Sequence, residues 1–214
     1  MRQVLAKTNK LSHAEFLQIV FADEVGRRDT TSAGRRARTA GLDQTMTLDR
    51  WDPIAAVTYD RSVWAELCAS RFVDSAHKAI VMGPVGVDET FLASALGQLA
   101  VRRRRSVHFE RSDRFFKRLR IARLDNSHDA ELRKPLSIDV LIIDDFALAA
   151  LDATATATAD LYETVVERHR RGSTIITSNR DPIARSAIDR LSSAAHQLRR
   201  EGWPFPGQPR SCAA

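Results

Sequence analysis

Short apolar runs that alternate with amphipathic stretches constrain the fold of this chain more than any other feature. The apolar runs fit buried strands and lie at residues 79–82, 107–109, 138–143 and 174–177. The stretches between them have helical spacing and cover residues 90–103, 112–123 and 157–170. A helix around residues 186–195 and a short strand near 196–198 complete the series. This alternation predicts an α/β fold in which a five-stranded parallel sheet carries helices on both faces.

A small helical extension is expected ahead of this sheet. Ser12 and Glu15 have the spacing of a capping box, and apolar residues follow at helical intervals, namely Phe16, Leu17, Val20 and Phe21. The helix is predicted to end near Arg28, because residues 29–50 are polar and glycine-bearing and fit a linker or a partly ordered arm. We therefore expect three parts: an N-terminal helix and basic linker over 1–50, a main domain over 51–202 and an irregular tail over 203–214.

The secondary structure of two further segments can also be predicted. Residues 59–72 read as one helix, with apolar residues on one face at Val63, Trp64, Leu67 and Cys68. The low-complexity patch "DATATATAD", residues 152–160, is interpreted as a loop that enters a helix.

The composition and the first residues bear on the compartment. The chain is 43% hydrophobic and 28% charged, and no segment approaches the roughly 18 consecutive apolar residues that a membrane span needs. Met1 leads into Arg2 and Lys7 without an apolar block, so no secretion signal is expected. We predict a cytoplasmic protein without a membrane partner.

Paired carboxylates follow the third predicted strand. In "IDVLIIDDF" an apolar strand ends in Asp144 and Asp145, at the edge of the sheet where ligands of open α/β folds bind. Such a pair can serve as a Mg²⁺ ligand and as an acid that polarises an attacking water. A solvated acidic turn is the alternative. We favour the functional interpretation because two acids follow four buried residues.

Two later motifs stay ambiguous when each is taken alone. "STIITSNR" places Asn179 after the next strand, where its amide could reach a phosphate or position water, or could simply form a turn. "AIDRL" places Arg190 on a helix beside Asp189, so this arginine fits either a contact to a neighbouring subunit's phosphates or a surface ion pair.

The segment "GPVGVDET", residues 83–90, has the outline of the phosphate-binding loop G-x-x-x-x-G-K-[ST]. It carries Asp88 where the second glycine belongs and Glu89 where the lysine belongs. Taken alone, this match is weak, since a glycine turn between a strand and a helix has the same outline.

Together the motifs resemble a known family. "GPVGVDETFLASALG", "DVLIIDDF", "ERHRRGSTIITSNR" and "SAIDRLSSAAHQL" are similar, in order and spacing, to the IstB-type transposition helpers, relatives of the DnaC helicase loaders in the AAA+ ATPase superfamily. The likeness runs from about Leu11 to Gly202. It implies an AAA+ fold, ATP and Mg²⁺ bound at subunit interfaces, a homo-oligomer on DNA and an insertion-sequence transposase as partner.

The resemblance assigns roles to individual residues. It places Gly83, Pro84, Gly86, Glu89 and Thr90 in the nucleotide-binding loop. Thr90 and Asp144 become the Mg²⁺ ligands, and the catalytic set consists of Asp145, the sensor Asn179 and the arginine finger Arg190.

This chain departs from the family pattern in its phosphate loop. Replacing lysine by Glu89 changes the local charge by two units opposite a polyanion, and a unit pair at about 4 Å is worth about 4 kcal/mol at an effective dielectric near 20. Asp88 adds a second repulsive charge, and a carboxylate could itself fill the anion site. We expect ATP hydrolysis to be lost or severely impaired. The segment 181–186 is also shorter than in the family, and the ending after Gly202 differs.

Positive charge is concentrated in one stretch. Between Val101 and Arg123 there are nine arginines and one lysine against two acids. The net charge of this stretch, +8, is larger than the +6 of the whole chain. In the family the helix here lies toward DNA, and the candidate phosphate contacts are Arg111, Arg114, Lys117, Arg118, Arg120 and Arg123. A solvated basic face is the alternative.

Several functions remain open at this level. The chain could be an active ATPase that tolerates Glu89, a catalytically silent subunit for DNA binding or assembly, or a decayed copy of an insertion-sequence gene. A helicase-loader role shares most of the motifs, although "SAIDRL" and "AAHQL" favour the transposition helper.

Overall fold

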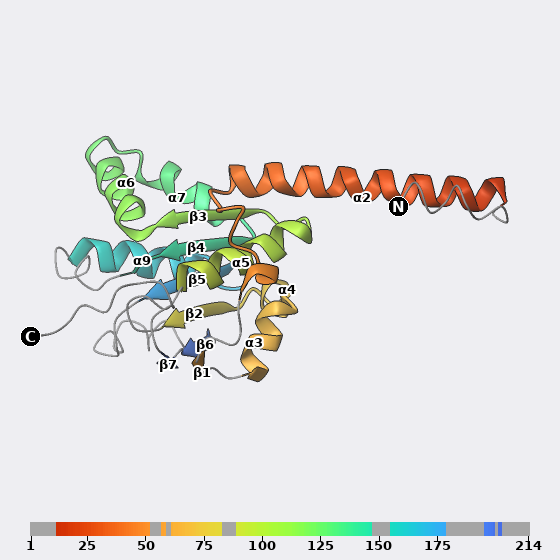
Figure 1. Cartoon of the computed structure of the whole chain (residues 1–214). Helices are drawn as coiled ribbons and strands as arrows, with labels where there is room; N and C mark the ends of the chain where they lie inside the picture. The colour runs from red at the N-terminus through yellow and green to blue at the C-terminus, as the bar shows by residue number, and fades with distance from the viewer. Residues whose placement is uncertain are drawn as a thin grey trace, which may run out of the picture.

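A five-stranded parallel sheet forms the centre of the molecule (Figure 1). The computed structural model describes residues 12–51, 57–58, 61–82, 89–146, 155–178, 195–199 and 201–202. The strands are β2 (Lys78–Met82), β3 (Val107–Arg111), β4 (Val140–Asp144), β5 (Ser173–Ser178) and β6 (Ala195–Arg199), in the order β3-β4-β5-β2-β6. All neighbouring strands are parallel. The predicted five-stranded parallel sheet is confirmed, including the short strand near residues 196–198.

Helices cover both faces of this sheet, as predicted. One face carries α5 (Glu89–Arg102), with α2 (His13–Thr39), α3 (Arg61–Cys68) and α4 (Arg71–Asp74) packed around it. The other face carries α6 (Ser112–Leu124), α7 (His128–Leu136) and α9 (Ala155–Glu167). Because successive side chains of a strand point to opposite faces, Ile142 of β4 joins the first core and its neighbours Leu141 and Ile143 join the second.

Helix α5 packs closely against the sheet at one glycine. A Cβ at Gly97 would lie 2.8 Å from the Cδ1 atom of Ile142 and 2.9 Å from the Cδ2 atom of Leu42. A larger residue at this position would therefore have to displace the ends of the Ile142 and Leu42 side chains, so glycine lets α5 lie close against β4 and the segment after α2.

The prediction that the N-terminal helix ends near Arg28 is wrong, because α2 continues to Thr39. The predicted capping box is present, with Glu15 N–H donated to Ser12 Oγ at 3.3 Å and Ser12 N–H donated to a Glu15 carboxylate oxygen at 2.8 Å. The expected linker over 29–50 is ordered because Ala37, Ala40 and Leu42 are buried in the first core. Tertiary burial here outweighs the local glycine and threonine content.

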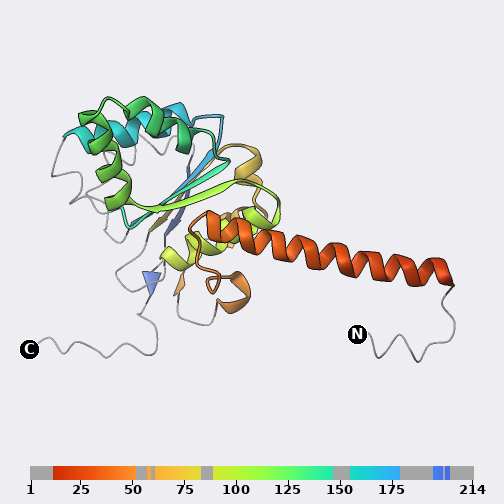
Figure 2. The same ribbon diagram turned by 90° about the horizontal axis from the view of Figure 1, so that it is seen from above.

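The N-terminal half of α2 extends beyond the rest of the molecule, as two views at right angles show (Figures 1 and 2). Its C-terminal half lies along α5. The side chain of Arg36 fixes this contact, since Nη2 donates to the carbonyl oxygen of Val101 at 3.0 Å. In the part of the chain that the structure describes, no helix is both long and apolar enough for a membrane span.

Smaller differences concern element boundaries. The helix expected over 59–72 is divided into α3 and α4, and Ser70 between them has a left-handed backbone with φ of 54°. Helix α7 was not predicted. The patch expected to be a loop before a helix is helical from Ala155 onward. Of the helix expected around 186–195, residues 186–194 lie outside the described residues, and Ala195 begins β6.

A two-stranded antiparallel pair, β1 (Val57–Thr58) and β7 (Glu201–Gly202), lies apart from the main sheet.

Candidate functional site

The carboxyl edge of the sheet gathers the ends of the central strands. Met82, the last residue of β2, lies opposite Ser178 of β5, and Asp144, the last residue of β4, lies opposite Arg111 of β3. Helix α5 begins at Glu89, and six residues separate it from the end of β2. The predicted Mg²⁺-associated acid, Asp144, is therefore placed at the carboxyl edge of the sheet, and its contact with Thr90 sets it beside the first turn of α5.

Asp144 is held by two hydroxyl groups. It is 4% exposed, and Thr90 Oγ1 donates to its two carboxylate oxygens at 2.9 and 3.1 Å. Thr177 Oγ1 donates to the same carboxylate at 2.7 Å. A buried carboxylate beside a threonine hydroxyl is an all-oxygen donor set of the kind that Mg²⁺ prefers. The side chains of Thr90 and Asp144 thus fit the ion that the fold family implies.

Asp145 has a different environment from its neighbour. Its backbone is left-handed, with φ of 54°, and three polar contacts hold it there. Its N–H is donated to Thr177 Oγ1 at 2.8 Å, Ser112 Oγ donates to its carbonyl oxygen at 2.7 Å, and Arg111 Nη2 lies 3.2 Å from its Oδ2. A non-glycine residue in this conformation costs free energy, and Asp145 is one of six non-glycine residues with a positive φ in the described part of the chain.

Thr177 is the site residue that sequence reasoning missed. It is 1% exposed, and its one hydroxyl donates to Asp144 while accepting the N–H of Asp145. The signal that could have found it is the polar Thr177 at the end of "STIIT", where an apolar residue would continue the buried strand.

Glu89, which the resemblance predicts to stand at the position of a phosphate-loop lysine, is half-buried at the start of α5. Its Oε1 atom is shielded from solvent. A carboxylate at a helix N-terminus lies where the helix dipole favours negative charge, which is also where a phosphate group would bind.

The remaining predicted nucleotide-site residues lie outside the described residues. These are Gly83, Pro84, Gly86, Asn179 and Arg190, together with the substituted Asp88.

The cations predicted for DNA on and beside α6 fall into two groups. In the first group, Arg118 is bound by two carboxylates, with Nη2 at 2.7 Å from Glu110 Oε2 and Nη1 at 2.6 Å from Glu131 Oε2. Burial of Glu110 opposes its ionisation, but hydrogen bonds from His108 and Arg118 outweigh this and lower its pKa to about 2. Arg111 also belongs to this group, because it pairs with Asp113 and Asp145.

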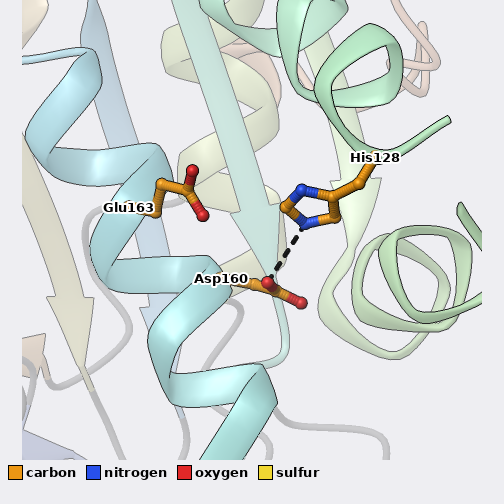
Figure 3. A group of neighbouring side chains, drawn as sticks. All are labelled: His128, Asp160 and Glu163. Atoms are coloured by element: carbon orange, nitrogen blue, oxygen red, sulfur yellow. Dashed lines mark hydrogen bonds and ion pairs between the residues drawn. The ribbon is translucent and has the colours of Figure 1, made fainter. Parts of the chain in front are cut away.

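Arg123 completes the first group through a buried acid on α9. It forms an ion pair with Asp160, which is 1% exposed, and its Nη2 lies 4.0 Å from Glu163. His128 Nε2 approaches the same Asp160 oxygen at 3.2 Å (Figure 3). His128, Asp160 and Glu163 offer ligand atoms within 4.8 Å of one another. Because Arg123 binds the Asp160 oxygen that faces His128, its guanidinium already supplies the positive charge at this cluster.

The second group lies on the outer surface of α6. Arg114, Lys117 and Arg120 are exposed, and no ion pair of theirs occurs within the described ranges. Ile121 and Leu124, 52% and 83% exposed, lie on the same helix. This second group is the part of the predicted basic face whose charge is available to a partner.

Comparison with known proteins identifies the family. The family model described as "IstB-like ATP binding protein" matches residues 2–192. The chain belongs to this family of IstB-like ATP-binding proteins. The putative ATP-binding protein Rv3427c in an insertion sequence of Mycobacterium tuberculosis is similar to this IstB-like chain. The two are 33% identical over 213 residues, which cover 94% of this chain and 84% of that relative.

Solved structures agree on the fold of this IstB-like protein. The replication initiator DnaA bound to AMPPCP and single-stranded DNA matches with a TM-score of 0.62 at 16% identity, over 75% of this chain and 51% of that one. The DnaC helicase loader matches with a TM-score of 0.56 at 16% identity, over 74% of this chain and 98% of that one. The IstB-like chain thus has the AAA+ P-loop fold and spans about half the length of that DnaA chain.

Proposed function

We propose that this IstB-like protein is a helper for insertion-sequence transposition whose own ATP hydrolysis is lost or severely impaired. The observation that carries the proposal is Glu89, an acid at the position of the phosphate-loop lysine, directly before Thr90 and its contact to Asp144. The contact of Thr90 with Asp144 supports a carboxylate–hydroxyl arrangement like that of an ATPase, while the proposed position of Glu89 would reverse the charge that attracts the phosphates.

The proposed chemistry of the site follows from the residues at the sheet edge. Mg²⁺, when bound with ATP, would neutralise developing negative charge on the phosphates. Thr90 and Asp144 would hold this ion, and Asp145 would polarise the attacking water. Glu89 and Asp88 oppose the approach of the polyphosphate, so each step that needs bound nucleotide is disfavoured. Asn179 and Arg190 keep their proposed roles as sensor and as arginine finger toward a neighbouring copy.

DNA binding is the proposed activity that survives the substitutions in the phosphate loop. Arg114, Lys117 and Arg120 can contact phosphates without reading sequence. Arg111, Arg118 and Arg123 would contribute less, because carboxylates already neutralise them. We therefore expect weak, salt-sensitive and sequence-tolerant binding to duplex DNA.

The remaining partners are proposed from the family. They are a transposase of the same insertion sequence and further copies of this chain on DNA, in the cytoplasm, with residues 51–202 as the ATPase-like domain. A silent assembly subunit that donates Arg190 to an intact neighbour is compatible with the charge reversal at Glu89. The fold shared with the DnaC loader makes helicase loading the second candidate.

A turnover assay tests the central part of this proposal. We expect the purified chain to release no phosphate from ATP above background, with and without DNA. Clear turnover that disappears in the Asp145→Asn variant would show that hydrolysis is intact and would refute the proposal.

A further inference from the structure

A histidine and two acids converge where α7 and α9 pack beside α6. His128 is the first residue of α7, and Asp160 and Glu163 lie three positions apart on α9, so both acids occupy one face of that helix. Both carboxylates extend from α9 toward the imidazole ring (Figure 3). Each side chain offers one ligand atom, and these atoms lie within 4.8 Å of one another. One nitrogen and two oxygens are therefore available to a single cation.

The type and spacing of these ligand atoms suit Zn²⁺. Imidazole nitrogen favours first-row transition metals, whereas Mg²⁺ and Ca²⁺ favour ligand sets made of oxygen alone. Zn²⁺ binds such nitrogen and oxygen atoms at about 2.1 Å, so two of its tetrahedral ligands lie about 3.4 Å apart. His128 Nε2 and Asp160 Oδ1 are already 3.2 Å apart. The side chain of Glu163 is 48% exposed, which leaves it free to rotate toward this pair.

In the described part of the chain, the acids of this cluster outnumber the cation that pairs with them. Asp160 and Glu163 carry two negative charges. Arg123 supplies one positive charge, through an ion pair with Asp160 and a longer contact of 4.0 Å to Glu163. Because Asp160 is 1% exposed, its carboxylate requires a cation beside it. A divalent ion would neutralise both acids, whereas the guanidinium neutralises one.

We propose that His128, Asp160 and Glu163 form a Zn²⁺ site in which the ion exchanges with the guanidinium of Arg123. The two cations exclude each other, because Arg123 pairs with the same Asp160 oxygen that faces His128. The side chain of Arg123 is 39% exposed, so its charge can move into solvent while α6 stays in place. The bound ion would then connect α7 to α9. This exchange needs neither nucleotide nor DNA and is independent of the proposed function.

Calorimetric titration of the full chain with Zn²⁺ tests the site. Every chain carries serine in place of Cys68 and Cys212, so that thiols do not bind the ion, and Mg²⁺ is present in excess to occupy sites made of oxygen alone. The otherwise unchanged chain should bind Zn²⁺. His128→Gln and Glu163→Gln should each weaken this binding at least tenfold, since each removes one ligand. The matched control His169→Gln removes an exposed histidine just beyond α9 and should leave the affinity within about twofold.

The competing guanidinium provides the second measurement. Arg123→Gln should bind Zn²⁺ about tenfold more tightly, because the ion no longer has to displace a cation from Asp160. Without metal this variant leaves a buried carboxylate unpaired, so its midpoint of thermal unfolding should fall. Zn²⁺ should restore the midpoint, and should raise it more in Arg123→Gln than in the parent chain.

Three results would overturn the proposal. One is the absence of Zn²⁺ binding by the parent chain, even if Arg123→Gln binds the ion, because the native guanidinium would then exclude it. Another is binding that both His128→Gln and Glu163→Gln leave unchanged, since the ion would then lie elsewhere. The third is an Arg123→Gln variant that binds Zn²⁺ no more tightly than the parent chain, which would show that the two cations do not share a site.

Discussion

The carboxyl edge of β4 and the helix α6 are both predicted from the sequence to bind a ligand of opposite charge, yet they hold their charges differently. At the edge, Asp144 is surrounded by the neutral hydroxyls of Thr90 and Thr177, so its negative charge is not neutralised by these contacts. On α6, Arg118 and Arg123 are matched by carboxylates of the same chain. The partners of a charged residue, more than its place in a motif, decide whether a ligand can use the charge.

The largest effect on stability is expected from Arg118. Arg118→Ala leaves Glu110 and Glu131 facing each other in a half-buried site and should lower the free energy of unfolding by about 3 kcal/mol, a value that partial solvent access keeps at the low end for such pairs. Denaturant unfolding measures this change. The same substitution should alter DNA affinity less than twofold, because Arg118 is already neutralised.

Arg114→Ala is the control on the same helix. It should change stability by less than about 0.5 kcal/mol and should reduce DNA affinity instead. If both variants affected stability and DNA binding equally, the division of α6 into structural and available cations would be wrong.

The next largest effect on stability is expected when the protein is acidified. The folded-state pKa of Glu110 is about 2, below its ordinary value of 4.5, so its contribution to stability is full above about pH 4.5 and is lost as the pH falls toward 2. With allowance for partial solvent access, the loss should be about 2 kcal/mol.

Glu110→Gln should be less stable at neutral pH and should lose correspondingly less stability between pH 5 and 2. Parallel curves of unfolding free energy against pH for the wild-type and variant chains would contradict the assignment of this titration to Glu110.

At the sheet edge, Thr177→Val tests whether the hydroxyl of Thr177 connects Asp144 and Asp145 through its hydrogen bonds. The valine leaves the buried N–H of Asp145 without its acceptor and should cost about 1–2 kcal/mol of stability. Thr177→Ser keeps the hydroxyl and should restore most of this loss. A serine variant as unstable as the valine variant would point to packing of the methyl group in place of the hydrogen bonds.

The sequence pattern predicts the strands and helices that carry Asp144 and the arginines of α6. It does not predict which residues these side chains contact. Strand and helix alternation and the position of Asp144 follow from local pattern, since buried parallel strands are continuously apolar and end in polar residues. The pairing of Arg118 with Glu110 and Glu131 joins residues 8 and 13 positions apart in the chain. Hydrophobic periodicity does not encode contacts of this kind. From the sequence alone, all the cations on and beside α6 were therefore predicted to be available for DNA phosphates.

The length of α2 was missed for a similar reason. Its C-terminal half contains glycine and threonine, which weaken helices on their own, and tertiary contacts such as the packing of Ala37 against the core and of Arg36 on Val101 stabilise it. Thr177 was overlooked because its role depends on the neighbouring strand.

The smallest effects concern the available cations of α6. Arg114→Ala and Lys117→Ala should each weaken binding to duplex DNA severalfold and reduce the slope of log affinity against log salt by about 0.9 per lost phosphate contact. Fluorescence anisotropy at several salt concentrations measures both quantities. Affinity that does not depend on salt would exclude a phosphate-contact role for this face.

The proposed charge reversal in the predicted phosphate loop is tested most directly by ATP binding to the wild-type chain and to a variant that carries Asp88→Gly with Glu89→Lys. Removing two repulsive charges and restoring one attractive charge should tighten ATP binding at least hundredfold, with wild-type binding too weak to measure at micromolar protein. Micromolar ATP binding by the wild-type chain, unimproved by the two substitutions, would contradict the account.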